Sequence, residues 1–355
     1  MQDQELNADF VADQLVGDTT LRLPRFGLGA AHFGGQRGRV PAEVARETLQ
    51  AAWDGGVRYY DTAPFYGRGL SEHRLGEFLI DRNRADFILT TKVGRVFRRP
   101  GDPDWRDTTR WPGGLKFEFD FDYSGDGVLR SYEQSLLRLG LDRVDALLIH
   151  DPDRRAHGDE WQARMRDMAT SGIKALEGLK RSGDIQAIGM GLNTAEALAE
   201  IPDMVPLDFV LVAMPYTLLD QSGLADLDRL ADRGVAVIVG APFASGILVT
   251  GPGPGARYRY QAAEPEIQQK AGAIQKVCES HGVPLASAAM HFPLAHRGVV
   301  SIIPGCAHPD EIKSNLTAFR QQIPDALWAD LKDAGLIVAN APVPDRTSRI
   351  TIRDT

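Results

Sequence analysis

The stretch V-R-Y-Y-D-T-A-P-F-Y-G, residues 57–67, joins a short β-rich run to a carboxylate and a tyrosine. Asp61 ends the run, and Tyr66 lies in the loop that follows it. Two later runs also end in ionisable residues, F-I-L-T-T-K in Lys92 and V-D-A-L-L-I-H in His150. Side chains at the carboxyl ends of strands converge on one mouth of a (β/α)8 barrel, although they are far apart in sequence. We therefore expect these four residues to form one proton-transfer site.

Short apolar, β-branched runs recur along the chain, with amphipathic stretches between them. Their nearly continuous hydrophobicity is typical of parallel strands that are covered on both faces. The runs are residues 25–30, 57–61, 87–92, 144–150, 185–191, 208–214, 235–241 and 299–304. The stretches with helical periodicity are residues 44–53, 71–79, 129–139, 168–181 and 267–281, the second with Ser71 as a possible N-cap. This alternation predicts a parallel sheet that closes into a (β/α)8 TIM barrel.

No linker divides the chain, so residues 1–355 are expected to form a single barrel domain with peripheral tails at 1–18 and 341–355. Residues 20–23 are expected to form a β-hairpin with residues 25–27, as a cap on the barrel bottom.

Two long segments interrupt the alternation of strands and helices. Residues 95–127 contain two tryptophans, several prolines and several glycines, and residues 249–263 contain the run G-P-G-P-G. Long loops at the catalytic mouth of a barrel usually form part of the site or a lid. Both segments are expected to overhang the same mouth.

Composition favours an ordinary globular protein, with 43% hydrophobic and 25% charged residues. The net charge of −8 argues against a nucleic-acid partner. The two cysteines suggest no disulfide framework, the N-terminus lacks the features of a signal peptide, and no apolar stretch is long enough for a membrane span. The histidines show no metal-ligand spacing. The expectation is a cytoplasmic protein without a metal, acting on a small molecule.

Seven pieces, three of which overlap the stretches quoted above, follow in order along the chain and carry a resemblance. They are Y-D-T-A-P-F-Y-G (60–67), T-T-K-V-G (90–94), L-L-I-H-D-P-D (147–153), I-G-M-G-L-N (188–193), P-Y-T-L-L-D-Q (215–221), A-P-F-A-S-G-I-L (241–248) and I-P-G-C-A-H-P-D-E-I-K-S-N (303–315). Together they resemble the aldo-keto reductase superfamily, and most of all its branch of aldose, L-fucose and pyridoxal dehydrogenases. The resemblance covers residues 20–320.

This resemblance implies hydride transfer between a nicotinamide and a carbonyl–alcohol pair. It makes Tyr66 the general acid–base, Lys92 the cation that lowers the pKa of that phenol, and Asp61 the residue that holds Lys92. His150 would orient the substrate oxygen. Each residue alone also has a structural interpretation: a turn cap for Asp61, packing for Tyr66, a solvated strand end for Lys92 and a structural imidazole for His150. Their combination favours the catalytic interpretation.

The adenosine phosphate end of the cofactor is expected at residues 305–315, where a helix N-terminus suits anions. Where many NADP-preferring relatives have two cations, this chain has Gly305 and Glu311. A carboxylate accepts a hydrogen bond from a free ribose hydroxyl but repels a phosphate, so NAD is predicted over NADP. Lys313 remains an alternative cation. Asn315 is a further expected contact.

The nicotinamide end departs from the family pattern. The usual Ser-Asn pair after the fifth strand is Gly191 and Leu192 here, so Asn193 is expected to take over the amide contact. Gly29 and Asp61 at the first strand ends are also expected to touch the cofactor.

The aromatic side chain that many relatives stack on the nicotinamide is replaced by Gly240. Tyr216 or Phe243 could compensate for it. Ser245 and Gly246 are candidates for pyrophosphate contacts.

Because cellular NAD is mostly oxidised, NAD preference favours a dehydrogenase. The expected substrate is a sugar hemiacetal or pyridoxal in its hemiacetal form. Phe33, Phe97, Trp105 and Trp111, with Tyr66 and His150, could line its pocket, since aromatic faces suit such ligands. The four aromatic residues could equally pack a loop onto the barrel.

Two alternative functions stay open. The first is an NADPH-dependent aldehyde or ketone reductase on the same fold. The second is a regulatory subunit that binds the cofactor with little turnover. The presence of Asp61, Tyr66, Lys92 and His150 argues against the second.

Overall fold

The computed structural model of the protein describes residues 13–36, 38–108, 110–201 and 205–344. Its central sheet has eight strands in the order β14-β11-β10-β9-β8-β5-β4-β3, and neighbouring strands are parallel throughout. The strands are β3 (Leu28–Gly29), β4 (Tyr59–Asp61), β5 (Ile88–Val93), β8 (Ala146–His150), β9 (Ala187–Leu192), β10 (Phe209–Val212), β11 (Ala236–Val239) and β14 (Val299–Ile302). Parallel bridges from Phe26 to Ile302 and from Gly29 to Gly305 join the two ends of the sheet. The predicted (β/α)8 barrel is confirmed, and each strand lies within or overlaps one predicted run.

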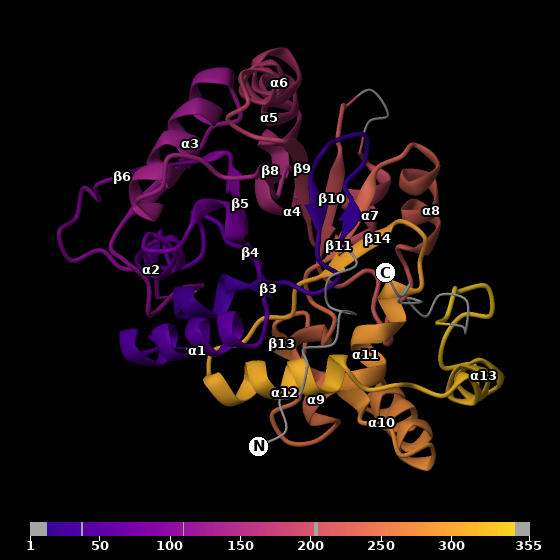
Figure 1. Ribbon diagram of the computed structural model, residues 1–355. Helices are drawn as coiled ribbons and strands as arrows, with labels where there is room; N and C mark the ends of the chain where they lie inside the picture. Colours follow the sequence, from indigo (N-terminus) through magenta and orange to yellow (C-terminus); the bar gives the residue numbers. More distant parts are fainter. Residues whose placement is uncertain (1–12, 37, 109, 202–204, 345–355) are drawn as a thin grey trace.

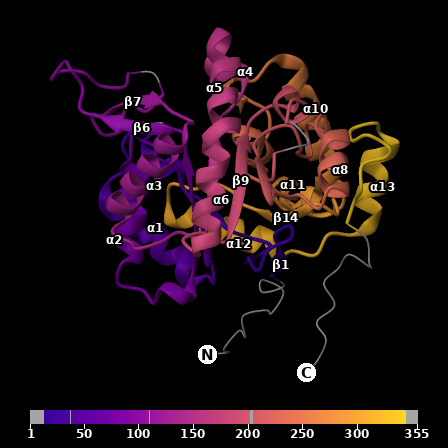
Figure 2. The same ribbon diagram turned by 90° about the horizontal axis from the view of Figure 1, so that it is seen from above.

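Helices surround the strands, as the two perpendicular views show (Figures 1 and 2). They are α1 (Ala42–Asp54), α2 (Leu70–Leu79), α3 (Gly125–Leu139), α4 (Arg154–His157), α5 (Trp161–Asp167), α6 (Ile173–Ser182), α7 (Ala195–Ala199), α8 (Leu224–Asp232), α9 (Ile247–Thr250), α10 (Pro265–Ser280), α11 (Leu285–Leu294), α12 (Pro309–Phe319) and α13 (Asp325–Asp333). A π-helical turn at Met168–Gly172 leads into α6. All five helices expected from periodicity are present.

The expected N-cap of α2 is wrong. The helix follows Gly69, whose φ of 95° is a conformation that glycine adopts without strain. Ser71 lies inside the helix, where its hydroxyl donates to the carbonyl of Ala30 at 2.8 Å and lies 2.8 Å from Thr62 Oγ1. Ser71 thus ties the helix to the segment that contains Asp61.

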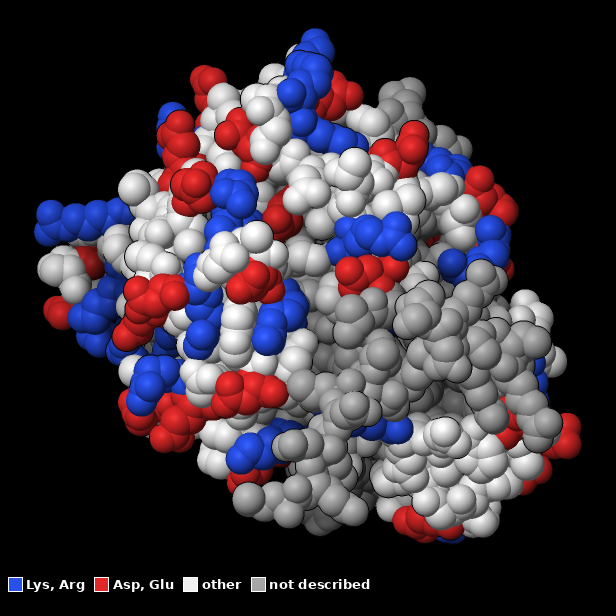
Figure 3. Space-filling model, viewed as in Figure 1, with Lys and Arg blue, Asp and Glu red and all other residues white. Residues whose placement is uncertain are grey.

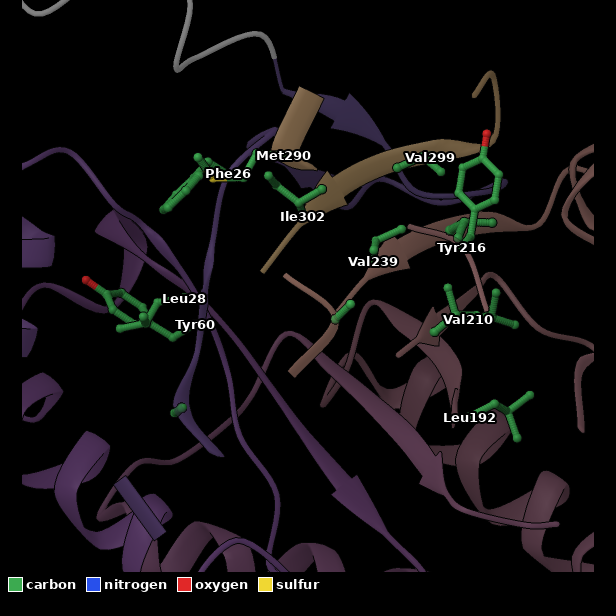
Figure 4. Close-up of a cluster of buried hydrophobic side chains, with 14 of the residues drawn as sticks. Phe26, Leu28, Tyr60, Leu192, Val210, Tyr216, Val239, Met290, Val299 and Ile302 are labelled. Atoms are coloured by element: carbon green, nitrogen blue, oxygen red, sulfur yellow. The ribbon is translucent and has the colours of Figure 1, made fainter. Parts of the chain in front are cut away.

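Residues along each strand alternate between two hydrophobic layers, as the pleat of a strand requires. In β8, Leu148 belongs to the inner layer, whereas Leu147 and Ile149 belong to the larger layer between strands and helices. Figure 4 shows part of the larger layer, with Val210 and Val239 on neighbouring strands.

This alternation determines where the candidate catalytic side chains point. Asp61 is two residues after the inward-facing Tyr59, and His150 is two residues after the inward-facing Leu148. Lys92 lies four residues after Ile88 in β5, so the two side chains point to the same face of the strand. Ile88 packs against the inner layer. All three side chains therefore point into the barrel at the carboxyl ends of their strands.

A hairpin closes the bottom of the barrel, but its pairing differs from the prediction. β1 (Gln14–Leu15) pairs antiparallel with β2 (Arg22–Leu23), and Val16, Leu21 and Leu23 are buried in the inner layer. The expected partner, residues 25–27, instead enters the barrel wall, where Gly27 N donates to Ile302 O at 2.9 Å.

The tails predicted at the two ends are described only in part. Residues 13–18 belong to the cap on the barrel bottom, and Ala341 is buried. Residues 1–12 and 345–355 lie outside the described part of the chain.

Each long loop contains a small antiparallel hairpin. In residues 95–127, β6 (Arg95–Arg98) pairs with β7 (Glu118–Phe121), and Figure 2 shows this hairpin projecting beside α3. In residues 249–263, β12 (Arg257–Tyr258) pairs with β13 (Gln261–Ala262).

Acidic and basic side chains are interspersed over the coloured part of the face in Figure 3. Within the described ranges, no helix is both long and apolar enough to cross a membrane.

Candidate active site

The catalytic mouth of the barrel holds a cavity of about 480 Å³. Asp61, Tyr66, Lys92 and His150 all line it, so the structure brings the four predicted residues together. Both long loops contribute to its wall, one through Arg110 and Trp111 and the other through Tyr260.

Lys92 and Asp61 form a buried ion pair at the floor of the cavity. Lys92 Nζ donates to Asp61 Oδ2 at 2.6 Å and to the carbonyl of Thr62 at 2.8 Å, while Thr90 Oγ1 donates to Asp61 Oδ1 at 2.8 Å. Burial raises the pKa of the Asp61 carboxyl, against the opposing effects of Lys92 and Thr90. The pair holds the ammonium in one position below the Tyr66 ring.

Tyr66 stands half-buried among three of its neighbours. Its ring centre lies 5.0 Å from Lys92 Nζ, 5.8 Å from the His150 ring and 5.6 Å from the Trp111 ring. Burial raises the pKa of the phenol well above its ordinary value of 10, and the charge of Asp61 raises it further. Arg95 is a cation that lowers this pKa, but burial outweighs it. The lowering expected from Lys92 stays a prediction.

His150 is buried at the end of β8. Burial lowers the pKa of the imidazole well below 6.5, although Asp151 acts in the opposite direction. The ring is therefore neutral near pH 7. Nδ1 is buried without a hydrogen-bond partner among the described residues, while Nε2 lies 3.5 Å from Asp151 Oδ2. His150 lines the cavity, and a neutral imidazole there is suited to hydrogen-bond a substrate hydroxyl or carbonyl.

Asp151 is a site residue that the sequence reasoning missed. Its backbone has φ of 50°, and its carboxylate accepts from Arg95 Nη2 at 2.7 Å and from Asn193 Nδ2 at 2.8 Å. Burial opposes ionisation, but His150, which carries a charge only at low pH, and Arg95 lower the pKa of Asp151 to about 2. Its only sequence signal is that it directly follows His150.

Most of the predicted cofactor contacts line the same cavity. The cavity extends from the catalytic residues to the start of α12, where Glu311 Oε2 accepts from the amide of Ala307 at 2.7 Å. Asp310 and Ser314 line this end as well. The predicted contacts in its wall are Gly29, Asp61, Asn193, Phe243, Ser245, Gly246, Gly305, Glu311 and Asn315.

Tyr216 is not placed for a cofactor contact. Its ring is fully buried outside the barrel interior, 5.4 Å from Phe292 and 5.5 Å from His296 between ring centres. It belongs to the layer between strands and helices, as Figure 4 shows.

Of the four aromatic residues considered for the substrate pocket, only Trp111 lines the cavity. Phe33 is fully buried in the layer between strands and helices. Phe97 stacks on Phe117 with ring centres 6.2 Å apart, and Trp105 packs against the guanidinium of Arg68. Phe97 and Trp105 therefore pack the loop onto Arg138 of α3 and onto Arg68, which was the alternative interpretation, whereas Phe33 belongs to the core.

Two glycines keep the cavity floor open beside the catalytic residues. A Cβ atom on Gly191 would lie 3.6 Å from Lys92 Cε and 3.8 Å from His150 Cδ2. Gly240 follows the inward-facing Ile238 by two positions, and Gly191 follows the inward-facing Ala187 by four, so a side chain at either would enter the mouth.

Comparison with known proteins matches residues 25–335 to the model of the "Aldo/keto reductase family". The chain belongs to this family. It is therefore an oxidoreductase of a family that uses nicotinamide cofactors. In the described part of the chain, no group of three or more His, Cys, Asp or Glu residues is placed to hold a metal ion.

Characterised relatives place it in the branch expected from its motifs. It is 38% identical to pyridoxal 4-dehydrogenase of Microbacterium luteolum over 336 residues, 91% of this chain and 97% of the relative. It is 37% identical to D-threo-aldose 1-dehydrogenase of a Pseudomonas species over 325 residues, 89% of this chain and 95% of the relative.

Solved structures show the same fold. An aldo-keto reductase from Bacillus halodurans in its holo form is 24% identical with a TM-score of 0.71, over 95% of this chain and 99% of that one. Glycerol dehydrogenase from Gluconobacter oxydans is 21% identical with a TM-score of 0.69, over 94% of this chain and 97% of that one.

Proposed function

We propose that the protein oxidises a sugar hemiacetal, or pyridoxal in its hemiacetal form, with NAD as hydride acceptor and Tyr66 as general base. The observation that carries this proposal is one continuous cavity. It joins Tyr66, Lys92 and His150 to an acidic end at Asp310 and Glu311.

The residues present fit a nicotinamide dinucleotide. Gly191 leaves space above Lys92 and His150 for a flat ring, and Asn193 Oδ1 is available to accept from a carboxamide because only its Nδ2 is used by Asp151. Gly246 has φ of 107° and open space around its Cα, so a pyrophosphate can approach the backbone there.

The acidic end favours NAD over NADP. Lys92 and Arg110 are the only lysine and arginine side chains among the described residues of the cavity wall, and neither lies on α12. Glu311 and Asp310 would accept hydrogen bonds from a ribose diol and would repel a 2′-phosphate. Lys313 faces a separate surface pocket between α1 and α12 and does not line this cavity.

Each catalytic residue would have a separate role in the reaction. His150 would hydrogen-bond the substrate hydroxyl and fix its carbon over the open floor at Gly191. Tyr66 would take the hydroxyl proton, and Lys92 would stabilise the resulting phenolate. The bound nicotinamide supplies the hydride acceptor. In the reverse direction, Tyr66 would return the proton to the carbonyl oxygen.

The substrate class follows from the relatives, which are named for pyridoxal and for aldoses. Trp111 supplies an aromatic wall beside Tyr66 that suits either a sugar face or a heteroaromatic ring. We place the activity in the cytoplasm, since Cys278 and Cys306 are both free and buried.

The test is a spectrophotometric screen at 340 nm with NAD and NADP against a panel of aldoses and pyridoxal. We expect the higher kcat/KM with NAD on at least one of these substrates. A higher value with NADP or NADPH would instead support the reductase alternative. Cofactor binding without turnover on any substrate would support a regulatory subunit.

A further inference from the structure

Arg110 and Tyr260 meet over the mouth of the barrel. They come from the two long loops, and the guanidinium carbon of Arg110 lies 4.9 Å from the centre of the Tyr260 ring. Both side chains line the catalytic cavity. Each loop is fastened to the barrel close to the reacting residues, so this meeting point is held in place.

The first fastening involves the turn that carries Tyr66. Arg68, two residues later, donates to Asp107 Oδ2 from Nη2 at 2.8 Å and from Nε at 3.1 Å. Asp107 Oδ1 in turn accepts from the amide of Arg110 at 2.9 Å. One buried carboxylate therefore couples the position of Arg110 to the catalytic turn.

The second fastening holds Tyr260. Its amide donates to Ser245 Oγ at 3.0 Å, and the neighbouring Tyr258 hydroxyl donates to Asp220 Oδ2 at 2.8 Å. Arg259 and Tyr260 have φ of 49° and 66°, left-handed conformations that non-glycine residues adopt only where the surroundings fix them. The turn thus directs the Tyr260 ring toward the cavity.

The guanidinium of Arg110 has no carboxylate partner among the described residues. Within the described ranges its guanidinium makes no ion pair, whereas the other cation of the cavity wall, Lys92, is bound to Asp61. Burial is the largest cause of the lowered pKa of His150, and the charge of Arg110 is one of three cationic charges that lower it further. Arg110 therefore acts electrostatically on the catalytic residues. A cation of this kind, exposed at the rim and aimed over the site, is suited to an anionic oxygen on a ligand.

We propose that Arg110, backed by Tyr260, is a substrate-binding residue that selects substrates carrying an anionic oxygen near the reacting hydroxyl. This inference rests on the proposed function and narrows its substrate class. The oxygen would be a carboxylate, as in a hexuronic acid, or a phenolate, as in pyridoxal near neutral pH. Trp111 on one side and Tyr260 on the other would hold the ring of either substrate.

The test compares matched substrates on matched variants. The substrate pairs are D-galacturonate with D-galactose, and pyridoxal with 3-deoxypyridoxal, each differing in the anionic oxygen. Arg110→Gln removes the charge at the rim. Arg106→Gln removes an equal charge from an exposed residue of the same loop that does not line the cavity. We expect Arg110→Gln to lower kcat/KM about tenfold for the anionic member of a pair, mainly through KM, and to leave the neutral member nearly unchanged.

The two substrate pairs show which anionic group of the substrate Arg110 binds. Selective loss for D-galacturonate assigns a carboxylate, and selective loss for pyridoxal assigns a phenolate. Equal loss for both members of each pair, or an equal effect of Arg106→Gln, would overturn the proposal. Arg110→Lys, which keeps the charge, should retain most of the selectivity.

Binding at the Arg110 subsite can be measured even if the protein oxidises none of these substrates. If no substrate is oxidised, calorimetric binding of D-galacturonate and of pyridoxal to the protein with NADH still measures the subsite. Binding of at least one probe that Arg110→Gln weakens and Arg106→Gln does not would support the anion subsite. Absence of binding for both probes, or equal weakening by both variants, would refute it.

Discussion

Lys92 Nζ lies 2.6 Å from Asp61 Oδ2, and these side chains are only 1% and 2% exposed. A buried ion pair that loses one partner leaves an unpaired charge, which costs far more than the pair contributes. Asp61→Asn should therefore lower the free energy of unfolding by about 3–5 kcal/mol, measured by urea denaturation. Lys92→Met combined with Asp61→Leu should recover part of that loss while the enzyme stays inactive. Glu200→Gln in the exposed pair with Arg154 is the control and should change stability much less. An equal loss in the control would contradict this account.

The raised pKa of Tyr66 predicts the pH dependence of the reaction. The phenol is protonated up to and beyond pH 10, so the base required for oxidation becomes more available as pH rises, whereas the acid required for reduction is always present. The kcat/KM for oxidation should rise from pH 7 to pH 10 without a plateau, and that for reduction should stay flat. A plateau below pH 8 would show that the bound cofactor lowers the pKa of Tyr66.

Tyr66→Phe should lower kcat by roughly 10²–10⁴-fold, the usual contribution of a general acid–base. Cofactor affinity, measured by fluorescence titration, should change little, because the phenylalanine keeps the aromatic ring and its packing on Trp111. Unchanged turnover would remove Tyr66 from the mechanism.

Asp151 combines a buried charge with a left-handed backbone, and two variants separate these features. Asp151→Asn keeps a residue that tolerates φ of 50° but leaves Arg95 without its charge partner, which should cost about 3 kcal/mol of stability. Asp151→Ala should lose a further 1–2 kcal/mol or so because alanine is strained in that conformation. Equal stability of the two variants would show that the backbone is not strained.

The pKa of Asp151 also gives these variants a pH signature. Since its folded pKa is about 2 and its ordinary value is 3.8, its charge stabilises the protein fully above pH 3.8. That contribution is lost as pH falls toward 2. The stability difference between wild type and Asp151→Asn should therefore shrink between pH 4 and pH 2, as followed by urea denaturation at each pH.

Gly191 and Gly189 lie two residues apart on β9 and offer a matched pair. A Cβ on Gly191 makes only ordinary contacts, so Gly191→Ala should fold normally but weaken NAD binding by obstructing the floor. A Cβ on Gly189 would lie 2.5 Å from the Phe209 ring, so Gly189→Ala should lose about 1–3 kcal/mol of stability by overpacking. Unaltered NAD affinity in Gly191→Ala would place the nicotinamide elsewhere.

The sequence was sufficient to place Asp61, Lys92 and His150, because strand parity and strand ends are local properties. Each of these residues ends an apolar run, and the barrel brings the ends of such runs together. The sequence was not sufficient for Tyr216, which lies beyond the end of β10, where the strand alternation no longer fixes the direction of a side chain.

Residues on the long loops were harder to predict, since their positions depend on contacts between distant segments. Arg110 is placed by the bond between Arg68 and Asp107, and Tyr260 by its bond to Ser245. Neither contact has a periodic signal in the sequence. Asp151 is adjacent to His150, but only its left-handed backbone brings its carboxylate back toward Arg95 and Asn193.

Glu311 provides the sharpest test of cofactor choice. Its Oε2 accepts from the amide of Ala307, a bond that the amide oxygen of Glu311→Gln can keep while the charge is lost. The ratio of kcat/KM for NADP to that for NAD should rise about tenfold in Glu311→Gln, and further in Glu311→Arg, because repulsion of a 2′-phosphate is removed and then reversed. Glu133→Gln, an exposed acid on α3 away from the cavity, is the control for net charge and should leave the ratio unchanged. If Glu311→Arg leaves the ratio unchanged as well, the adenosine ribose does not lie at the start of α12, and the preference for NAD has lost its structural basis.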